Sequence, residues 1–289
     1  MNVCLGKIRN DAPGYQQLIS LYHDAHSSSE QTVLVDFSKT SWFDANICAP
    51  LGALLHRLRT EGKEIKIGSL PNSVKEIFSK NAFLKDFGMN VETDVNRTTM
   101  RYSRFEPADE KSFPSYIETH FKGKGIPRMT AALTARFREG ILELFSNAVL
   151  HSETKHGIFV CGQYFPRRKS LDFSIVDMGV GIRHNVVTKR GLNMGAEFAI
   201  AWALQGNNTT KTGSIPGGLG LKLIRDFIKL NGGRIQIVSD SGYWETRKGT
   251  DTIHSFTAPF PGTLVNIEIN TADKSSYRLA TEPAPANLF

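Results

Sequence analysis

The stretch TAALTARFREGILELFSNAVLH, residues 130–151, has the periodicity of one long amphipathic helix, and the rest of the chain can be organised around it. Its apolar residues recur every three or four positions and form one stripe that faces a core. The members of that stripe are Phe137, Ile141, Leu144, Phe145 and Ala148. Glu143 and Asn147 are one turn apart and project together from a side well off the stripe. Alone the pair is typical of a solvated helix face, but a carboxylate can accept a proton and a carboxamide oxygen suits Mg²⁺.

Composition indicates a soluble globular protein, and the chain is long enough for two domains, each with its own core. No apolar run approaches the ~20 residues of a membrane span, and residues 1–7 lack a secretory signal. The three cysteines are isolated, which argues against a disulfide framework and favours a cytoplasmic location. The net charge of +7 is carried by scattered basic residues, so we expect an anionic small ligand or a solvated surface and no nucleic-acid partner.

The first part of the chain alternates strand and helix. Strands are expected at residues 32–37 and 64–69, helices at 15–26, 73–80 and from the segment 41–46 to about residue 59, and a further short strand at 89–91. Asp44 or Asn46 can cap the second of these helices, and Pro50 must lie near its first turn. The pattern predicts a small α/β domain with a mostly parallel sheet over residues 1–93. The polar segment 94–111 is expected to be a linker.

The second part carries short motifs at the ends of predicted elements. After a helix at 113–121 and the long helix, strands at 157–163 and 171–176 form a hairpin, and the second runs into DMGVGI. Asp177 can accept a hydrogen bond from an exocyclic amine, and Gly179 and Gly181 allow the backbone to bend close to a ligand. Residues 183–216 read as a lid with a short helix at 196–204.

GGLGL, residues 217–221, then opens a helix over 219–230, where free N–H groups can meet phosphate. Strands follow at 234–239 and 264–269, the second of them preceded by Gly262 and Thr263. The long connection between these two strands has room for an extra hairpin. The remaining segment, 271–289, is expected to be a mobile tail.

In this order, ExxxN on a helix, DxGxG after a strand, GGLGL opening a helix and GT before a strand closely resemble the nucleotide site of the GHKL ATPase superfamily, over residues 112–270. The N box ELFSNAVLH is most similar to those of anti-sigma-factor kinases and histidine kinases. The resemblance implies a Bergerat α/β sandwich, with a mixed sheet and helices on one face, that binds ATP and Mg²⁺.

The resemblance also implies roles for individual residues. Asn147 would bind Mg²⁺, Glu143 would be the general base, and Asp177 would hold the adenine amino group. The remaining positions implied to contact or support the nucleotide are Gly179, Gly181, Lys211, Gly217, Gly218, Gly220, Leu221 and Thr263, with Lys222 as an alternative phosphate contact.

Residues 1–93 resemble a STAS domain of the anti-sigma-factor-antagonist type, on the run VDFSKTSWFDANICAPLGALLHRL. Asp44 matches the aspartate of the Asp-Ser-Ser-Gly-like motif, and Ala45 and Asn46 occupy the two serine positions. Ile47 stands at the glycine. Because Asn46 has no hydroxyl, we expect a degenerate interaction module that is not phosphorylated there.

Three functions are compatible with these patterns. The first is a Mg²⁺-dependent ATP-binding switch or slow ATPase that regulates a protein partner through its STAS-like domain. The second is a serine/threonine kinase of the anti-sigma type that acts on a separate STAS protein, and the third is a catalytically inactive nucleotide-binding scaffold. The partner would be a STAS-domain protein or a second copy of the chain. A histidine kinase is disfavoured because no dimerisation helix pair is visible.

Overall fold

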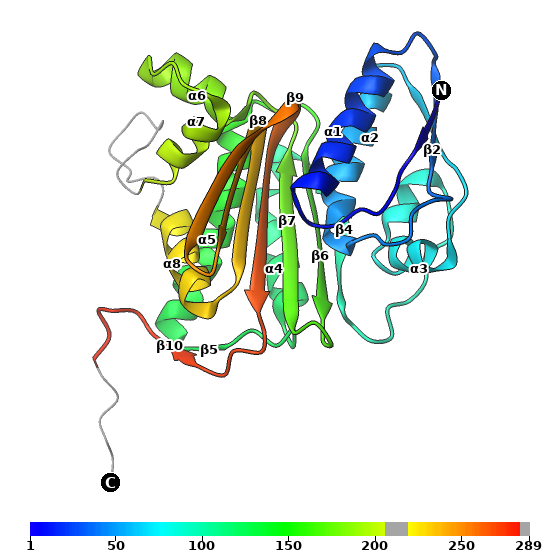
Figure 1. The fold of residues 1–289 in the computed structure, drawn as a ribbon. Coiled ribbons are helices and arrows are strands. Elements are labelled where there is room, and N and C mark those ends of the chain that lie inside the picture. The colour runs from blue at the N-terminus through cyan, green and yellow to red at the C-terminus, as the bar shows by residue number, and fades with distance from the viewer. Residues whose placement is uncertain (206–218, 284–289) are drawn as a thin grey trace.

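A computed structural model describes residues 1–205 and 219–283 of the chain and confirms the α/β fold class (Figure 1). The strands described are β1 (Asn2–Cys4), β2 (Thr32–Asp36), β3 (Glu64–Ile67), β4 (Thr99–Phe105), β5 (Arg128–Met129), β6 (Ile158–Phe165), β7 (Ser170–Asp177), β8 (Arg234–Arg247), β9 (Thr250–Asn270) and β10 (Ser276–Tyr277). The α-helices are α1 (Ala12–Ser27), α2 (Cys48–Thr60), α3 (Asn72–Lys80), α4 (Phe113–Phe121), α5 (Ala131–His151), α6 (Gly181–Arg190), α7 (Ala196–Ala203) and α8 (Leu219–Asn231). None of these helices combines the length and apolar character that crossing a membrane requires.

The N-terminal unit is built on a parallel three-stranded sheet in the order β1-β2-β3, as its alternating pattern predicts. Asp11 caps α1 by accepting a 2.9 Å hydrogen bond from the Gly14 N–H. Pro50 lies in the first turn of α2, where a proline costs little. The strand expected at residues 89–91 does not form, and that segment is irregular.

The larger sheet has the strand order β4-β6-β7-β9-β8, and every neighbouring pair is antiparallel. The expectation of a mixed sheet is therefore wrong for this unit. Hairpins connect β6 to β7 and β8 to β9, and a hairpin can join only antiparallel strands. The extra hairpin expected between residues 240 and 261 is confirmed as an extension of β8 and β9.

The boundary segments also differ from expectation. Residues 94–111 do not form a linker, because they contain β4, the edge strand that pairs with β6. The segment from residue 271 is not mobile throughout, since β10 pairs with β5 and the Thr130 N–H donates to the Tyr277 carbonyl at 3.0 Å. Both segments are polar and lack a periodic apolar pattern. Strands form in them nevertheless, because hydrogen bonding between backbones does not require apolar side chains.

Helices α4, α5 and α8 cover one face of the large sheet (Figure 1). The alternation along β7 explains this packing: Leu171, Phe173 and Ile175 point to the same face and are buried with the α5 stripe. The helix expected at residues 130–151 is confirmed. Thr130 caps it through a 3.2 Å bond from the Leu133 N–H.

The opposite face is covered by α1 and α2, which belong to the N-terminal unit (Figure 1). The side chains of Val176, Val238 and Leu264 project from this face of the large sheet. They are buried in the same apolar cluster as the side chains of α1 and α2. The N-terminal unit therefore shares its core with one face of the large sheet, while a second core lies between the other face and the helices α4, α5 and α8. Apolar burial that crosses a boundary stabilises the docked arrangement in proportion to the area removed from water.

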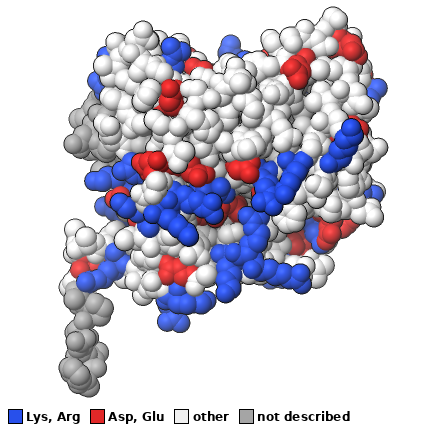
Figure 2. Space-filling view, in the orientation of Figure 1, with Lys and Arg blue, Asp and Glu red and all other residues white. Residues whose placement is uncertain are grey.

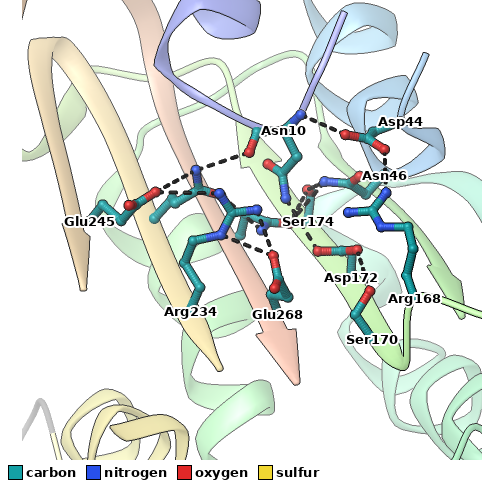
Figure 3. A network of polar contacts seen from close by, with 12 residues as sticks. Asn10, Asp44, Asn46, Arg168, Ser170, Asp172, Ser174, Arg234, Glu245 and Glu268 are labelled. Carbon is teal, nitrogen blue, oxygen red and sulfur yellow. Dashed lines mark hydrogen bonds and ion pairs between the residues drawn. The ribbon is translucent and has the colours of Figure 1, made fainter. Parts of the chain in front are cut away.

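Polar side chains fill the rest of this interface (Figure 3). Asn46 is fully buried, and its Nδ2 donates to Ser174 Oγ at 3.1 Å and to Asn266 Oδ1 at 3.0 Å. Asp44 accepts hydrogen bonds from the Asn10 N–H at 2.9 Å and from Arg168 at 2.8 Å. Neither side chain caps the helix, which corrects that expectation, because both are used across the interface.

Asp172 is a buried carboxyl of this network. Burial, followed by the nearby Glu268 carboxylate, raises the pKa of Asp172 well above its usual range, although Arg234 and Arg168 oppose the shift. Among the side chains labelled in Figure 3, the carboxylates Asp44, Asp172, Glu245 and Glu268 outnumber the guanidinium groups of Arg168 and Arg234.

We predict that Asp172→Asn raises the free energy of unfolding by about 1–2 kcal/mol at pH 8 and changes it little near pH 4. A carboxyl whose folded pKa is raised contributes stability below its unfolded pKa and loses it as the pH rises through the folded pKa. An asparagine can still accept the 3.3 Å bond from Asn10 Nδ2 and has no proton to lose. Urea denaturation at both pH values measures the effect, with Asp251→Asn at an exposed position of β9 as the control. Equal destabilisation at both pH values would contradict the prediction.

Charge on the surface is uneven. Lysine and arginine side chains gather in the lower half of the face shown in Figure 2, although they are scattered along the sequence. The turn between β6 and β7 contributes three exposed basic residues in succession, Arg167, Arg168 and Lys169. Such a surface attracts anionic groups over a range set by the ionic strength.

Candidate functional site

A cavity of about 180 Å³ opens between the end of α5, helices α6 and α7, and the large sheet. Its walls are mainly apolar, with a few polar groups at one side. The lining residues used below are Asn147, His151, Ser152, Ile175, Asp177, Gly181, Asn185, Val186, Trp202, Leu221, Ile237 and Thr263. This volume is several times the ~30 Å³ that one water occupies, so the cavity can admit a ring-sized group.

Helix α5 positions Asn147 and Glu143 differently. Asn147 lines the cavity, and within residues 1–205 and 219–283 its carboxamide makes no hydrogen bond. Glu143 lies one turn earlier, and its Oε2 accepts a 2.8 Å hydrogen bond from the Gly220 N–H. The carboxylate thus meets one of the free N–H groups at the start of α8, where helix geometry favours negative charge.

Gly220 allows α5 and α8 to approach each other at this point. A Cβ on Gly220 would lie 2.5 Å from Glu143 Oε2 and 2.8 Å from the Gly140 Cα, closer than real contacts permit. A Cβ on Gly140 would likewise lie 2.9 Å from the Gly220 carbonyl oxygen. Gly220 of the GGLGL motif is therefore explained by packing, because only a glycine there lets Glu143 lie against the start of α8.

Asp177 stands at the end of β7 and lines the cavity with only 5% of its surface exposed. Burial raises the pKa of its carboxyl to about 7, although hydrogen bonds from the backbone of Gly179 and Thr263 oppose the shift. The Gly179 N–H donates to Asp177 Oδ1 at 2.9 Å. A buried carboxyl with a strongly shifted pKa in a cavity is typical of a functional group.

The two glycines after Asp177 serve different purposes. Gly181 lines the cavity and begins α6 with a φ of +79°, a conformation that favours glycine. Gly179 contacts the end of α5, where a Cβ would lie 1.9 Å from the Ser152 carbonyl oxygen. The adjacent Val180 N–H donates to that same carbonyl at 2.8 Å. Gly179 therefore permits loop packing and does not itself line the cavity.

Thr263 lines the cavity and faces Asp177 in the β7–β9 register. Its hydroxyl lies 3.0 Å from Ser239 Oγ, which also accepts a 2.8 Å bond from the Ile182 N–H. Gly262, just before it, is required because a Cβ there would lie 2.0 Å from the Asp177 carbonyl oxygen. Strand β9 and the start of α6 are thereby held together around Asp177.

The structure thus brings together Asn147, Asp177, Gly181, Leu221 and Thr263 around one cavity, with Glu143 and Gly220 paired at the start of α8. Lys211, Gly217 and Gly218 lie outside the described residues. Lys222 is exposed and does not line the cavity.

Asn185, Ser239 and Trp202 are site residues that the sequence analysis did not identify. Asn185 was missed because residues 183–216 were expected to form a lid, whereas their first part is helical and belongs to α6. The spacing of Ile182 and Val186 is compatible with a helix, and that helix would have placed Asn185 one turn after Gly181. Ser239, at the end of a predicted strand, carried no comparable signal.

Over the described residues, no group of three or more histidine, cysteine or acidic side chains is arranged to hold a metal ion. A metal bound in this cavity would therefore depend on few protein ligands and on oxygens of its substrate, as Mg²⁺ commonly does. A scan against protein-family models finds no match for this chain, and a search of curated proteins finds none either.

Proposed function

We propose that this chain binds Mg-ATP in the cavity at the end of α5 and acts as a slow ATPase or nucleotide switch toward a protein partner. One observation carries the proposal: Asn147 on α5 and Asp177 after β7 line the same apolar-walled cavity, while Glu143 lies at the start of α8. Helix α5, the end of β7 and the start of α8, which supply these groups and the Gly220 N–H, are three separate stretches of the sequence. Their convergence supports a common role, as expected of a pocket with a few placed polar groups.

The residues suit the parts of a nucleotide. Asp177 can accept a hydrogen bond from the exocyclic amine of adenine, and Ile175, Val186 and Ile237 offer apolar surface to the ring. The start of α8 presents backbone N–H groups, which favour phosphate. Asn147 supplies an amide oxygen for Mg²⁺, and the bound cation would neutralise phosphate charge.

Glu143 is the candidate base. Its carboxylate now accepts the Gly220 N–H and would accept a proton from an attacking water once it is released from that contact. The same contact holds Glu143 against the helix terminus that would receive phosphate. Phosphate and Glu143 therefore compete for the N–H group of Gly220, which supports slow turnover.

The N-terminal unit would present the partner-binding surface as a fixed part of the molecule. It shares an apolar core with the large sheet, so we do not expect it to detach. Strand β7 links the two sides, because Asp177 lies in the cavity while Asp172 and Ser174 lie in the interface with the N-terminal unit. A change at the cavity can thus reach the N-terminal unit along one strand.

Isothermal titration calorimetry with ATP, in excess Mg²⁺ and in EDTA, tests the proposal. We predict that the intact chain binds more tightly with Mg²⁺, and that Asn147→Ala removes most of this difference because it removes the amide ligand. Asn90→Ala, at an exposed position of the N-terminal unit, is the control. Binding heat that is absent from the intact chain, or a Mg²⁺ effect that survives in Asn147→Ala, counts against the proposal. Release of labelled phosphate from γ-labelled ATP then separates a turnover enzyme from a binding switch.

A further inference from the structure

Asn185 has a fixed orientation in the wall of the cavity. It is 6% exposed, and its Nδ2 donates to the His151 carbonyl at 2.9 Å and to the Gly181 carbonyl at 3.1 Å. If the amide were rotated by 180°, its oxygen would face both carbonyl oxygens. Three acceptors would then meet with no donor between them, so no hydrogen bond could form. The remaining polar atom, Oδ1, is therefore a hydrogen-bond acceptor whose position is set by α5 and α6.

That acceptor is buried and has no hydrogen-bond partner among the described residues. Buried polar atoms without a partner are uncommon in folded proteins, because the group loses its hydration and gains nothing in return. Asn185 lines the same cavity as Asp177, from a position one turn into α6, the helix that follows the loop after Asp177. The cavity thus offers two acceptors within mainly apolar walls.

We propose that Asn185 Oδ1 accepts the second N–H of a ligand's exocyclic amine, the first being accepted by Asp177, and that the pair selects a 6-aminopurine over a 6-oxopurine. This inference rests on the proposed function and adds the residue that discriminates between purines. A 6-oxo group would bring a third acceptor against Asp177 and Asn185, whereas an amine supplies a donor to each. Two buried acceptors reject the wrong base more strongly than one, since each would be left unpaired.

The competing role for Asn185 is purely structural, because its Nδ2 already joins the end of α5 to the first turn of α6. A comparison of two ligands on the same protein separates the roles, since a structural defect weakens both ligands alike. The ligands are ATP and purine riboside triphosphate, which lacks the 6-amino group. The quantity measured by calorimetry is the ratio of the two dissociation constants, the analogue over ATP.

We expect Asn185→Ala to lower that ratio about tenfold relative to the intact chain, because one of the two bonds to the amine is lost. Asn185→Ser gives the same result in a less disruptive form, since its hydroxyl can donate to the Gly181 carbonyl one turn back. Thr188→Ala is the matched control. It removes a side-chain bond to the His184 carbonyl on the exposed side of the same helix, so the ratio should not change.

An unchanged ratio in both Asn185 variants, while the intact chain binds ATP, overturns the inference and leaves the proposed function standing. No binding of ATP by the intact chain overturns both. A lowered ratio in Asn185→Ala and Asn185→Ser, but not in Thr188→Ala, supports the assignment of Asn185 as a binding residue.

Discussion

Glu143→Gln should lower ATP turnover by about 100-fold or more while leaving ATP affinity nearly unchanged, because a glutamine cannot take the proton from an attacking water. The amide is otherwise a close match for the carboxylate. Its Oε1 can still accept the bond that Glu143 Oε2 receives from the Gly220 N–H at 2.8 Å. The start of α8 therefore stays capped, and the melting temperature should change little. Single-turnover phosphate release and calorimetry measure the two effects separately.

Two further variants separate catalysis from capping. Glu143→Ala loses the bond to Gly220 as well as the base, so we expect a stability loss of about 1 kcal/mol in addition to the loss of turnover. Glu139→Gln changes an exposed carboxylate one turn earlier, whose ion pair is with Arg136, and should alter neither property. If Glu143→Gln hydrolysed ATP at the normal rate, Glu143 would not be the base.

Asp177→Asn should weaken ATP binding about 100-fold, since a charge-assisted hydrogen bond contributes about 1.5–3 kcal/mol. The substitution keeps an oxygen for the Gly179 N–H, but it turns an N–H group toward the cavity, where a donor would oppose the amine of adenine. The folded protein itself should become more stable. Burial raises the pKa of Asp177 to about 7, which means that ionising this carboxyl costs free energy in the free protein.

The pH dependence of binding has a definite sign. Because an amine donates to the ionised carboxylate, ATP affinity should rise as the pH increases through about 7 and level off above it. Stability of the free chain should change in the opposite sense, falling as the pH rises from about 4 toward 7. Asp177→Asn should flatten both profiles. Calorimetry between pH 6 and pH 8 and urea denaturation between pH 4 and pH 8 check this, and pH-independent binding by the intact chain would exclude an ionising Asp177 from the site.

Much of the site could be predicted from local patterns. The helical period at residues 130–151 correctly predicts α5, and its phase places Asn147 off the apolar stripe and beside a cavity. The apolar run that ends at Asp177 correctly predicts β7 and its end. Elements of this kind are predictable because their side-chain period follows from backbone geometry alone.

Other parts of the site depend on segments that meet only in the folded chain. Nothing near Asn185 indicates that its amide will face the end of α5, and nothing near Glu143 indicates Gly220, which lies 77 positions later. Helix α6 is not evident from the sequence because its apolar stripe is short, one glycine precedes it and a second begins it. Short elements carry few periodic positions, so packing decides their form.

The residues alone determine that this chain forms two sets of strands and helices, and that β7 has an apolar face and a face with Ser170, Asp172 and Ser174. The alternation along β7 shows that the strand has two unlike faces. It does not show what covers the polar face, because either water or a polar protein surface can supply hydrogen bonds to those side chains. Tertiary structure alone decides between them. It places Asn10 and Asn46 of the N-terminal unit over that face and continues the apolar core of that unit onto the sheet. The sequence near β7 does not indicate these partners, because they lie more than 120 positions away along the chain.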